Sequence, residues 1–321
     1  MQSSITTEFG VKALITGASG FVGSHLTEHL LDEGDEVLGC SRHAAWPSSL
    51  LDDQRIARVK LLPWDVAQPL SPELRTEIQT FQPDCIYHLA AISIPQECGT
   101  VEPTQQAVEV NREGTRRVLG LAQFLGDVRL VLVSSSYVYS PLAETADCLI
   151  DETAEAIPVS AYGKTKREAE CLLNDAQPQV DWVVARAFAH TGPRQGDRMM
   201  LPEWCSQLVR GESPLQIQTM DSHFDLSDVR DVVRSYRLLA LSGVAGEIYN
   251  VGSGRSIRSG DVFELLQRIV GKSLDSIETA HSKRQHPIAD IRKLTRDTGW
   301  LPKTPLEETV RDTFQYWATK H

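Results

Sequence analysis

The chain has 321 residues, of which 41% are hydrophobic, and it carries a formal net charge of −11 at pH 7. This length and composition are typical of a globular protein with one large domain or two smaller ones, and the acidic balance argues against non-specific binding to nucleic acid. No segment reaches the roughly 20 consecutive apolar residues that span a bilayer.

The first ten residues, MQSSITTEFG, lack the basic and apolar stretches of a secretory signal. The six cysteines show neither a paired spacing nor a metal-type spacing, which favours reduced thiols over disulfides. We therefore expect a cytoplasmic protein that binds no metal ion, no membrane and no nucleic acid.

The first half of the chain alternates between strand-like and helix-like segments. The predicted strands cover 12–16, 36–40, 59–65, 85–90, 129–135 and 181–187, and the predicted helices cover 20–33, 104–125 and 161–175. Continuous apolar strands that alternate with helices indicate a parallel sheet covered on both faces. The sequence therefore predicts an α/β fold with a Rossmann-like, doubly wound sheet.

After residue 188 the pattern changes to turns and charged segments. Helices are predicted near 199–210, 228–242, 259–271, 290–298 and 305–319. We expect one domain over 11–187, with a segment of about 222–250 returning to it, and a smaller α/β domain made mainly of 188–321. The ligand crevice of such a fold lies at the carboxyl ends of the strands.

Three glycines lie between the first predicted strand and the first predicted helix, in LITGASGFVGSHL. Glycines at this spacing permit a tight turn and let backbone N–H groups and the helix dipole approach a phosphate. The pattern predicts the pyrophosphate site of a dinucleotide, although it also suits a plain strand-to-helix turn. The residues expected to contact the cofactor here are Gly17, Ser19, Gly20, Phe21, Val22 and Gly23.

The end of the second strand favours NADP(H) over NAD(H). An NAD site usually has a carboxylate here for the ribose 2′-hydroxyl, but this sequence has Ser41 followed by Arg42. An arginine can bind a 2′-phosphate through its planar guanidinium group, and the alternative is an arginine in a solvated loop. Asp65, next to Val66 after the third strand, could accept a bond from the adenine amino group or form an ordinary turn.

Tyr162 and Lys166 lie one helical turn apart in AYGKTKREAE. A free tyrosine has a pKa of about 10, so proton transfer near neutral pH needs a group that favours the phenolate. The Lys166 ammonium, together with an oxidised nicotinamide, would lower this pKa, and the lysine could also hold the nicotinamide ribose. Such pairs are common by chance, but Ser135 ends a buried-type strand where its hydroxyl could bond the substrate oxygen beside Tyr162.

These motifs, with HLAA at 88–91 and Asn111 in VNREGT, resemble the extended short-chain dehydrogenase/reductases that act on nucleotide sugars. The segments 186–195, 225–236 and 249–266 are most similar to GDP-4-keto-6-deoxy-D-mannose reductases and the related GDP-mannose 4,6-dehydratases. This resemblance implies hydride transfer at sugar C4, with Tyr162 as proton donor or acceptor, Lys166 as its electrostatic partner and Ser135 as the hydroxyl that polarises the substrate.

The resemblance also implies further site residues. Leu89, Ala90 and Ala91 would line the cofactor together with Tyr162 and Lys166, and Asn111 would have a structural or water-holding role. The residues expected to bind substrate are Ser93, Ser135, Arg194 and Arg284. His190 would contact the nicotinamide side or satisfy a loop carbonyl, and His88 suits a core histidine.

Three positions depart from this pattern. Tyr137 stands two residues after the catalytic serine, where dehydratases have a glutamate, which argues against dehydration but does not exclude C4 epimerisation. Ala189 replaces a usual asparagine, and Phe224 replaces an arginine that contacts the diphosphate, a contact worth roughly 1.5–3 kcal/mol. The cations that could substitute for it, each also a common type of surface residue, are Arg194, Arg198, Lys283 and Arg284.

We therefore expect NADPH-dependent reduction of the C4 ketone of a nucleotide-activated 4-keto-6-deoxyhexose, of the type that converts GDP-4-keto-6-deoxymannose to GDP-rhamnose. The alternatives are a nucleotide-sugar 4-epimerase, a 4,6-dehydratase and, from another class, a non-catalytic NADP(H)-sensing protein. The resemblance also implies a homodimer that pairs through the helix at 104–125 and the helix that carries Tyr162.

Overall fold

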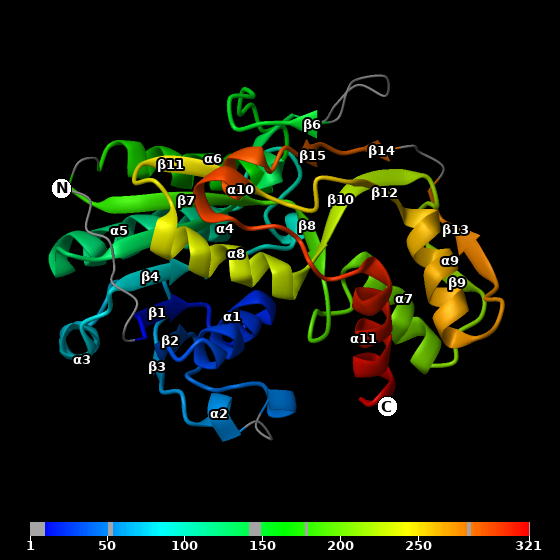
Figure 1. The fold of residues 1–321 in the computed structure, drawn as a ribbon, viewed down its shortest axis with the longest axis horizontal. Coiled ribbons are helices and arrows are strands. Elements are labelled where there is room, and N and C mark those ends of the chain that lie inside the picture. Colours follow the sequence, from blue (N-terminus) through cyan, green and yellow to red (C-terminus); the bar gives the residue numbers. More distant parts are fainter. Residues whose placement is uncertain (1–9, 51–53, 141–148, 177–178, 281–283, 321) are drawn as a thin grey trace.

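The structure, a computed structural model, is built around a seven-stranded sheet (Figure 1). It describes residues 10–50, 54–140, 149–176, 179–280 and 284–320. The strand order is β11-β7-β5-β4-β1-β2-β3, and every neighbouring pair is parallel. The strands are β1 (Lys12–Thr16), β2 (Glu36–Ser41), β3 (Leu61–Pro63), β4 (Cys85–His88), β5 (Arg129–Ser135), β7 (Asp181–Ala187) and β11 (Glu247–Val251). The predicted doubly wound α/β fold is confirmed.

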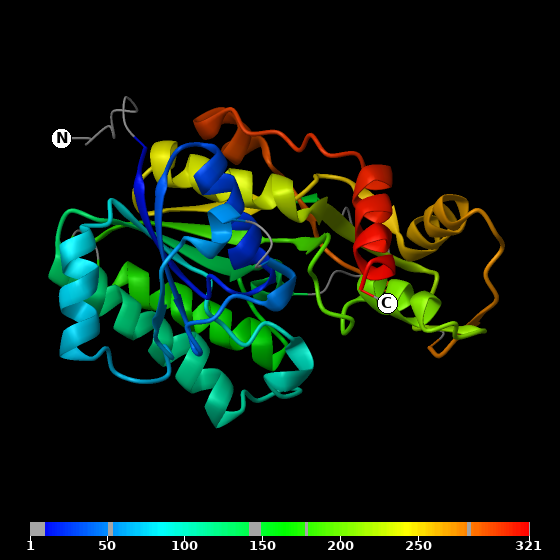
Figure 2. The same ribbon diagram turned by 90° about the horizontal axis from the view of Figure 1, so that it is seen from below.

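Helices cover both faces of this sheet, as Figures 1 and 2 show. One face carries α1 (Phe21–Asp32), α8 (Val229–Ser242) and α10 (Arg292–Thr298), and the other carries α3 (Pro72–Phe81), α5 (Gly114–Leu125) and α6 (Ala161–Asn174). Successive side chains of a strand point to opposite faces, so Leu130 packs in one core and Val131 in the other. Both faces are therefore apolar, which explains the continuous hydrophobic strands of the sequence.

A small lobe follows the sheet and forms a third core around Trp204 and Phe263. Its helices are α7 (Met200–Val209), α9 (Ser259–Val270) and α11 (Leu306–Ala318). Its strands are β8 (Ala189–Thr191), β9 (Leu215–Ile217), β10 (Ser222–Asp228), β12 (Ser256–Arg258), β13 (Ser276–Glu278) and β14 (Arg284–Gln285). Here β10 pairs with β8, which follows β7 directly, so the small lobe continues from the carboxyl edge of the main sheet.

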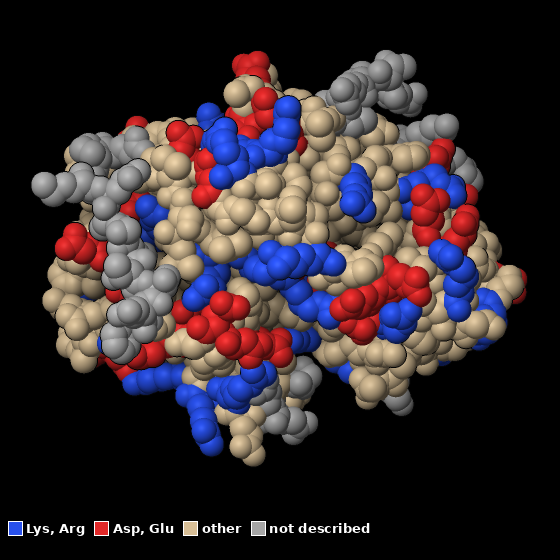
Figure 3. All heavy atoms as spheres, in the orientation of Figure 1, with Lys and Arg blue, Asp and Glu red and all other residues tan. Residues whose placement is uncertain are grey.

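The remaining elements are short and connect the larger ones. They are β6 (Leu149–Ile150), β15 (Ile288–Ala289), α2 (Gln54–Ala57), α4 (Gln105–Ala107) and four single turns at Ser48–Leu50, Pro95–Glu97, Val108–Glu113 and Ser136–Val138. In the described ranges no helix is long and apolar enough to cross a membrane. On the face in Figure 3, acidic and basic side chains are intermingled rather than separated.

Two predicted elements differ from the structure. The helix expected at 104–125 is interrupted, because Val108–Glu113 forms a π-helical turn between α4 and α5. The strand expected at 59–65 is only three residues long, because Pro63 has no N–H for further pairing and β3 lies at the edge of the sheet.

Candidate active site

A cavity of about 1890 Å³ opens at the carboxyl edge of the sheet and extends to the small lobe. Most of the predicted site residues line it. Those predicted for the cofactor are Gly17, Ser19, Gly20, Phe21, Val22, Gly23, Ser41, Arg42, Asp65, Val66, Leu89, Ala90, Ala91, Tyr162, Lys166 and His190, and those predicted for the substrate are Ser93 and Ser135. Arg194 is not among its lining residues.

The glycine loop has the shape that a pyrophosphate cradle requires. Gly17 has a φ of 74°, and a Cβ added to it would lie 2.8 Å from the Ala90 backbone nitrogen. A Cβ at Gly23 would lie 2.2 Å from the Gly17 carbonyl oxygen. Gly20 begins α1 without a side-chain cap, so the first N–H groups of this helix face the cavity without competition from a cap. These contacts explain the three glycines and fit a bound dinucleotide.

The end of β2 also lies at the cavity. Ser41 is buried, and its Oγ has no hydrogen-bond partner among the described residues. Arg42 follows at the cavity wall and is exposed. Asp65 accepts a bond from the Ala67 amide at 3.0 Å, which is the turn role foreseen for it, while it also lines the cavity.

Tyr162 and Lys166 lie in the first two turns of α6, which Ser160 caps by accepting a bond from the Gly163 amide at 3.1 Å. The Tyr162 side chain is only 8% exposed. Lys166 Nζ donates to the Val133 carbonyl oxygen at 2.9 Å and lies 6.0 Å from the centre of the Tyr162 ring. The helix therefore presents the phenol and the ammonium group together beside the end of β5.

The pKa of Tyr162 moves in the direction opposite to the one expected from Lys166. Burial raises the pKa of this phenol above its usual range, and the hydrogen bond with Ser135 lowers it only in part. Burial also lowers the pKa of the Lys166 ammonium to about 8. Tyr162 therefore keeps its proton at neutral pH, which suits a proton donor, and the folded chain alone does not favour the phenolate.

Asn111 has the structural role that the sequence indicated. It lies in the π-helical turn, where its Oδ1 accepts from the Ile92 amide at 2.8 Å and its Nδ2 donates to Thr165 Oγ1 at 3.0 Å. Asn111 thus ties the loop after β4 to the middle of α6, close to Lys166. Our sequence analysis did not predict the π-helical turn, which carries the Asn111 side chain that makes these contacts.

His88 and His190 lie in different environments. His88 contacts Thr16 Oγ1 at 2.7 Å and Thr115 Oγ1 at 3.0 Å, so it is a core histidine with both ring nitrogens satisfied. His190 contacts the Phe188 carbonyl oxygen at 2.9 Å and stacks on Phe21 while lining the cavity. It therefore satisfies a loop carbonyl and also lines the cavity, and contact with the nicotinamide stays a prediction.

Tyr137 lies directly beside the predicted proton donor. Its ring meets the Tyr162 ring edge-on at 5.5 Å between centroids, and Tyr137 is 42% exposed and lines the cavity. A Cβ at Gly163 would lie 2.1 Å from the Tyr137 carbonyl oxygen, so the glycine permits this close approach of backbone to helix. Position 137 therefore faces the reacting group with a phenol instead of a carboxylate.

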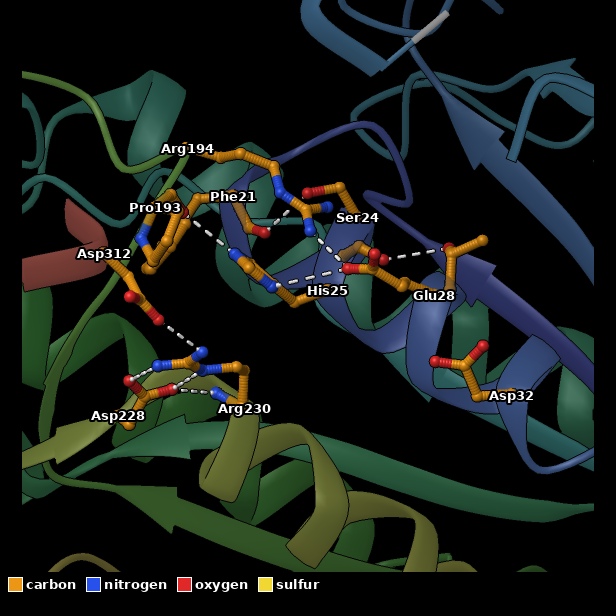
Figure 4. Close-up of polar contacts among 12 residues, drawn as sticks. Phe21, Ser24, His25, Glu28, Asp32, Pro193, Arg194, Asp228, Arg230 and Asp312 are labelled. Carbon is orange, nitrogen blue, oxygen red and sulfur yellow. Dashed lines mark hydrogen bonds and ion pairs between the residues drawn. The ribbon is translucent and has the colours of Figure 1, made fainter. Parts of the chain in front are cut away.

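Arg194 does not contact the cavity, contrary to the prediction that it binds substrate. Its guanidinium group pairs with Glu28 of α1, as Figure 4 shows, and its backbone adopts a φ of 71°. The neighbouring Pro193 carbonyl oxygen accepts a bond from His25 Nε2 at 2.9 Å. Because α1 already supplies a carboxylate, this arginine anchors the loop 192–199 to the large lobe.

Arg284 begins β14, where its backbone pairs with Ser222. The structure does not describe its side chain, and Lys283 lies outside the described residues. Of the two proposed replacements for the diphosphate-binding arginine whose side chains are described, Arg198 lines the cavity and Arg194 does not. Phe224, which stands where the family has that arginine, also lines it.

The segment HLTEH at 25–29 has a spacing that also occurs in some zinc sites. Here burial lowers the pKa of His25 to about 4, and its Nε2 is bonded to Pro193. In the part of the chain that the structure describes, no three His, Cys, Asp or Glu side chains are grouped to hold a metal ion.

Our sequence analysis missed a buried ionic network of Arg186, Glu170 and Ser134 next to the carboxyl end of β5. Arg186 donates from Nε to Glu170 Oε1 at 3.0 Å and from Nη2 to Glu170 Oε2 at 2.8 Å, and Ser134 Oγ donates to the same carboxylate at 2.5 Å. The available signal was Glu170 itself, which stands one helical turn after Lys166 in α6. The network fixes β5, α6 and β7 relative to one another next to Ser135.

The chain matches the model of the NAD dependent epimerase/dehydratase family over residues 13–252. It belongs to this family. A GDP-6-deoxy-D-mannose reductase of Pseudomonas aeruginosa is 29% identical, with 96% of this chain and 98% of that protein covered. UDP-glucuronic acid decarboxylase 1 of Xenopus tropicalis is also 29% identical, with 95% of this chain and 72% of that protein covered.

Solved structures of family members are similar over nearly the whole chain. RMD from Pseudomonas aeruginosa complexed with NADPH is 25% identical with a TM-score of 0.79, covering 97% of this chain and 100% of that one. A UDP-glucuronic acid 4-epimerase from Bacillus cereus, in complex with UDP-glucuronic acid and NAD, is 25% identical with a TM-score of 0.80 and the same coverage. This family member is therefore a nucleotide-sugar enzyme that uses a nicotinamide cofactor.

Proposed function

We propose that the protein is an NADPH-dependent reductase that acts on the C4 ketone of a nucleotide-activated 4-keto-6-deoxyhexose, of the type that yields GDP-rhamnose from GDP-4-keto-6-deoxymannose. The observation that carries this proposal is the pair of tyrosines in the cavity. Tyr162 is a buried phenol that keeps its proton, and its neighbour Tyr137 replaces the carboxylate that dehydration would need. The similarity to the GDP-6-deoxy-D-mannose reductase supports the same reaction class.

The nicotinamide cofactor, when bound, supplies the hydride that reduces the ketone carbon. Tyr162 donates its proton to the oxygen of this carbonyl group, and the Ser135 hydroxyl donates a hydrogen bond to the same oxygen. Lys166, charged below about pH 8, stabilises the phenolate that forms and is available to the ribose. Catalytic roles for Ser135, Tyr162 and Lys166 are thus part of the proposal.

The cofactor is proposed to be NADP(H) in preference to NAD(H). Arg42 stands at the end of β2 and lines the cavity, and the adjacent Ser41 Oγ lacks a partner among the described residues. A 2′-phosphate would give both groups a charge-assisted hydrogen bond, whereas a 2′-hydroxyl would leave the arginine without an anion. The similarity to a structure complexed with NADPH supports this preference, although other relatives are complexed with NAD.

A nucleotide-sugar 4-epimerase is the second candidate, because a UDP-glucuronic acid 4-epimerase is equally similar in structure. An epimerase first takes hydride from C4 onto the oxidised cofactor, and its second half-reaction then delivers hydride to a C4 ketone, as the reductase does. The two reactions differ in stoichiometry. A reductase consumes one NADPH for each ketone, whereas an epimerase restores its cofactor in every turnover and needs no external reductant.

The decisive experiment mixes the purified protein with NADPH and GDP-4-keto-6-deoxymannose and follows both NADPH oxidation and the sugar product. We expect stoichiometric oxidation, loss of turnover in Tyr162→Phe and unchanged NADPH binding by that variant. Turnover without net NADPH consumption would establish the epimerase instead. Unchanged turnover in Tyr162→Phe would refute the mechanism, and NADPH binding without turnover of any keto-sugar would favour the sensing protein.

Two further expectations belong to this proposal. A thermal-shift panel of GDP-, UDP-, dTDP- and CDP-sugars in the presence of NADPH should show the largest stabilisation with a GDP-sugar. Light scattering should give twice the mass of one chain, because relatives of this kind are expected to pair through α5 and α6. A shift with non-guanine nucleotides alone would exclude the GDP assignment.

A further inference from the structure

The cationic side chains that line the cavity are unevenly distributed. The described Lys and Arg residues among them are Arg42, Arg117, Lys166 and Arg198. Arg117 donates to the Val66 carbonyl oxygen at 3.1 Å, so it lies with Arg42 at the cofactor end, and Lys166 is bonded to Val133 of β5. Among the lysines and arginines whose side chains the structure describes, Arg198 is therefore the one that the small-lobe side contributes to the cavity.

Acidic side chains line the same part of the cavity, which makes the charge of Arg198 more important for an anionic ligand. Glu97, Asp197, Glu203 and Asp225 are among the lining residues. Asp225 is committed to the fold, because its carboxylate accepts bonds from the amides of Ser253, Gly254 and Ala289. Phe224 contributes no charge where an arginine would have met a diphosphate. Among the described lysine and arginine side chains, an anionic substrate thus has Arg198 to meet on this side.

Arg198 is paired across the cleft with an acidic side chain of the large lobe. Its Nη1 contacts Oε1 of Glu97, which belongs to the turn Pro95–Glu97 in the loop after β4 of the large lobe. Both side chains are about half exposed, at 54% for Arg198 and 45% for Glu97. An ion pair this exposed contributes little to stability, so it can be exchanged readily for a stronger one.

The loop that carries Arg198 is held firmly at its other end. Arg194 pairs with Glu28, and the Pro193 carbonyl oxygen accepts from His25, so α1 anchors the loop as Figure 4 shows. Thr191 Oγ1 also donates to Gln195 Oε1 at 2.6 Å within the loop. The loop then continues to α7, and between the anchor and this helix it places Arg198 at the cavity.

We propose that Arg198 binds the diphosphate group of the substrate, and that Glu97 holds this arginine across the cleft until the substrate arrives. A diphosphate carries two charges and offers several oxygens to the planar guanidinium group, whereas Glu97 offers one carboxylate. Substrate binding therefore exchanges one ion pair for a stronger one. This inference rests on the proposed function for its substrate class, a nucleotide-activated sugar.

The test measures Kd for GDP, UDP and dTDP by calorimetry on the full chain saturated with NADPH, so it does not depend on turnover. For the nucleotide that binds best, Arg198→Gln should weaken binding by roughly tenfold or more, since a charge-assisted contact is lost. Glu97→Gln should tighten it by about two- to fivefold, since the competing carboxylate is neutralised. NADPH affinity should be unchanged in both variants.

The double variant and a matched control complete the test. Glu97→Gln should have no further effect when combined with Arg198→Gln, because Glu97 acts through that arginine. Arg311→Gln removes another exposed arginine of the small lobe, which pairs with Glu307 away from this cavity, and it should leave Kd unchanged.

Three results would overturn the inference: wild-type affinity in Arg198→Gln, tighter binding from Glu97→Gln in the double variant, or no nucleoside diphosphate binding by the wild type. Nucleotide binding that responds to Arg198→Gln without reduction of any keto-sugar would instead leave this inference intact and refute the proposed reaction. Reduction of the keto-sugar that is unchanged in Arg198→Gln would leave the proposed reaction intact and refute this inference.

Discussion

Glu170→Gln should strongly destabilise the protein, although Glu170 does not line the cavity. The Glu170 and Arg186 side chains are 1% and 3% exposed and form two hydrogen bonds, at 2.8 and 3.0 Å. Removing the carboxylate charge leaves the Arg186 guanidinium buried without an anion, and the new amide group faces it as a second donor. Breaking a buried pair on one side costs about 3–5 kcal/mol. At about 2 °C per kcal/mol for a chain of this size, the melting temperature should fall by about 6–10 °C.

Thermal and urea unfolding of the protein without cofactor would measure this loss, with Glu168→Gln as the control. Glu168 lies on the same helix, but its side chain is exposed and its ion pair with the exposed Arg112 is long at 3.8 Å. Glu168→Gln should therefore change the free energy of unfolding by less than about 0.5 kcal/mol. If Glu170→Gln unfolds within about 1 kcal/mol of the wild type, the buried ion pair does not stabilise the junction of β5, α6 and β7 as argued.

Three other predictions concern the site itself. Gly163→Ala should lower kcat in the reductase assay far more than it weakens NADPH binding. The new Cβ would lie 2.1 Å from the Tyr137 carbonyl oxygen and would displace Tyr137 from Tyr162. Full activity of this variant would exclude a tight contact between residues 163 and 137. The value of kcat/KM should fall as pH rises through about 8, because Lys166 loses its proton there while burial keeps Tyr162 protonated. A constant kcat/KM up to pH 10 would contradict this expectation. Arg42→Ser should raise KM for NADPH by roughly tenfold and leave KM for NADH unchanged, and equal effects on the two cofactors would refute a 2′-phosphate contact.

Much of the large lobe could be predicted because its signals are local. Strand β5 is a continuous apolar run, and the glycine loop and the Tyr162–Lys166 spacing each lie within a few residues. Alternating side chains of strands buried on both faces leave little freedom in how such segments assemble. The doubly wound fold and the cavity that gathers Gly17, Ser135 and Tyr162 followed from these patterns.

The remaining features depend on contacts between distant residues. Arg194 was predicted to bind substrate because Phe224 replaces the usual diphosphate-binding arginine, but Glu28, 166 positions away in sequence, pairs with it. The π-helical turn depends on Asn111 reaching Ile92 and Thr165. The pKa of Tyr162 depends on the burial of its side chain, which no spacing reveals. In each case a tertiary partner decides the outcome.

The contact between Gly163 and Tyr137 has a consequence for how this reaction could be changed. Position 137 is located by its main chain, since its carbonyl oxygen rests against the first turn of α6 where only a glycine leaves room. The side chain at 137 can therefore change while the main chain keeps its place beside α6. A single substitution at position 137 could therefore place a new acid or base beside Tyr162. Reactions of this family that differ in the need for such a group could be interconverted by few mutations.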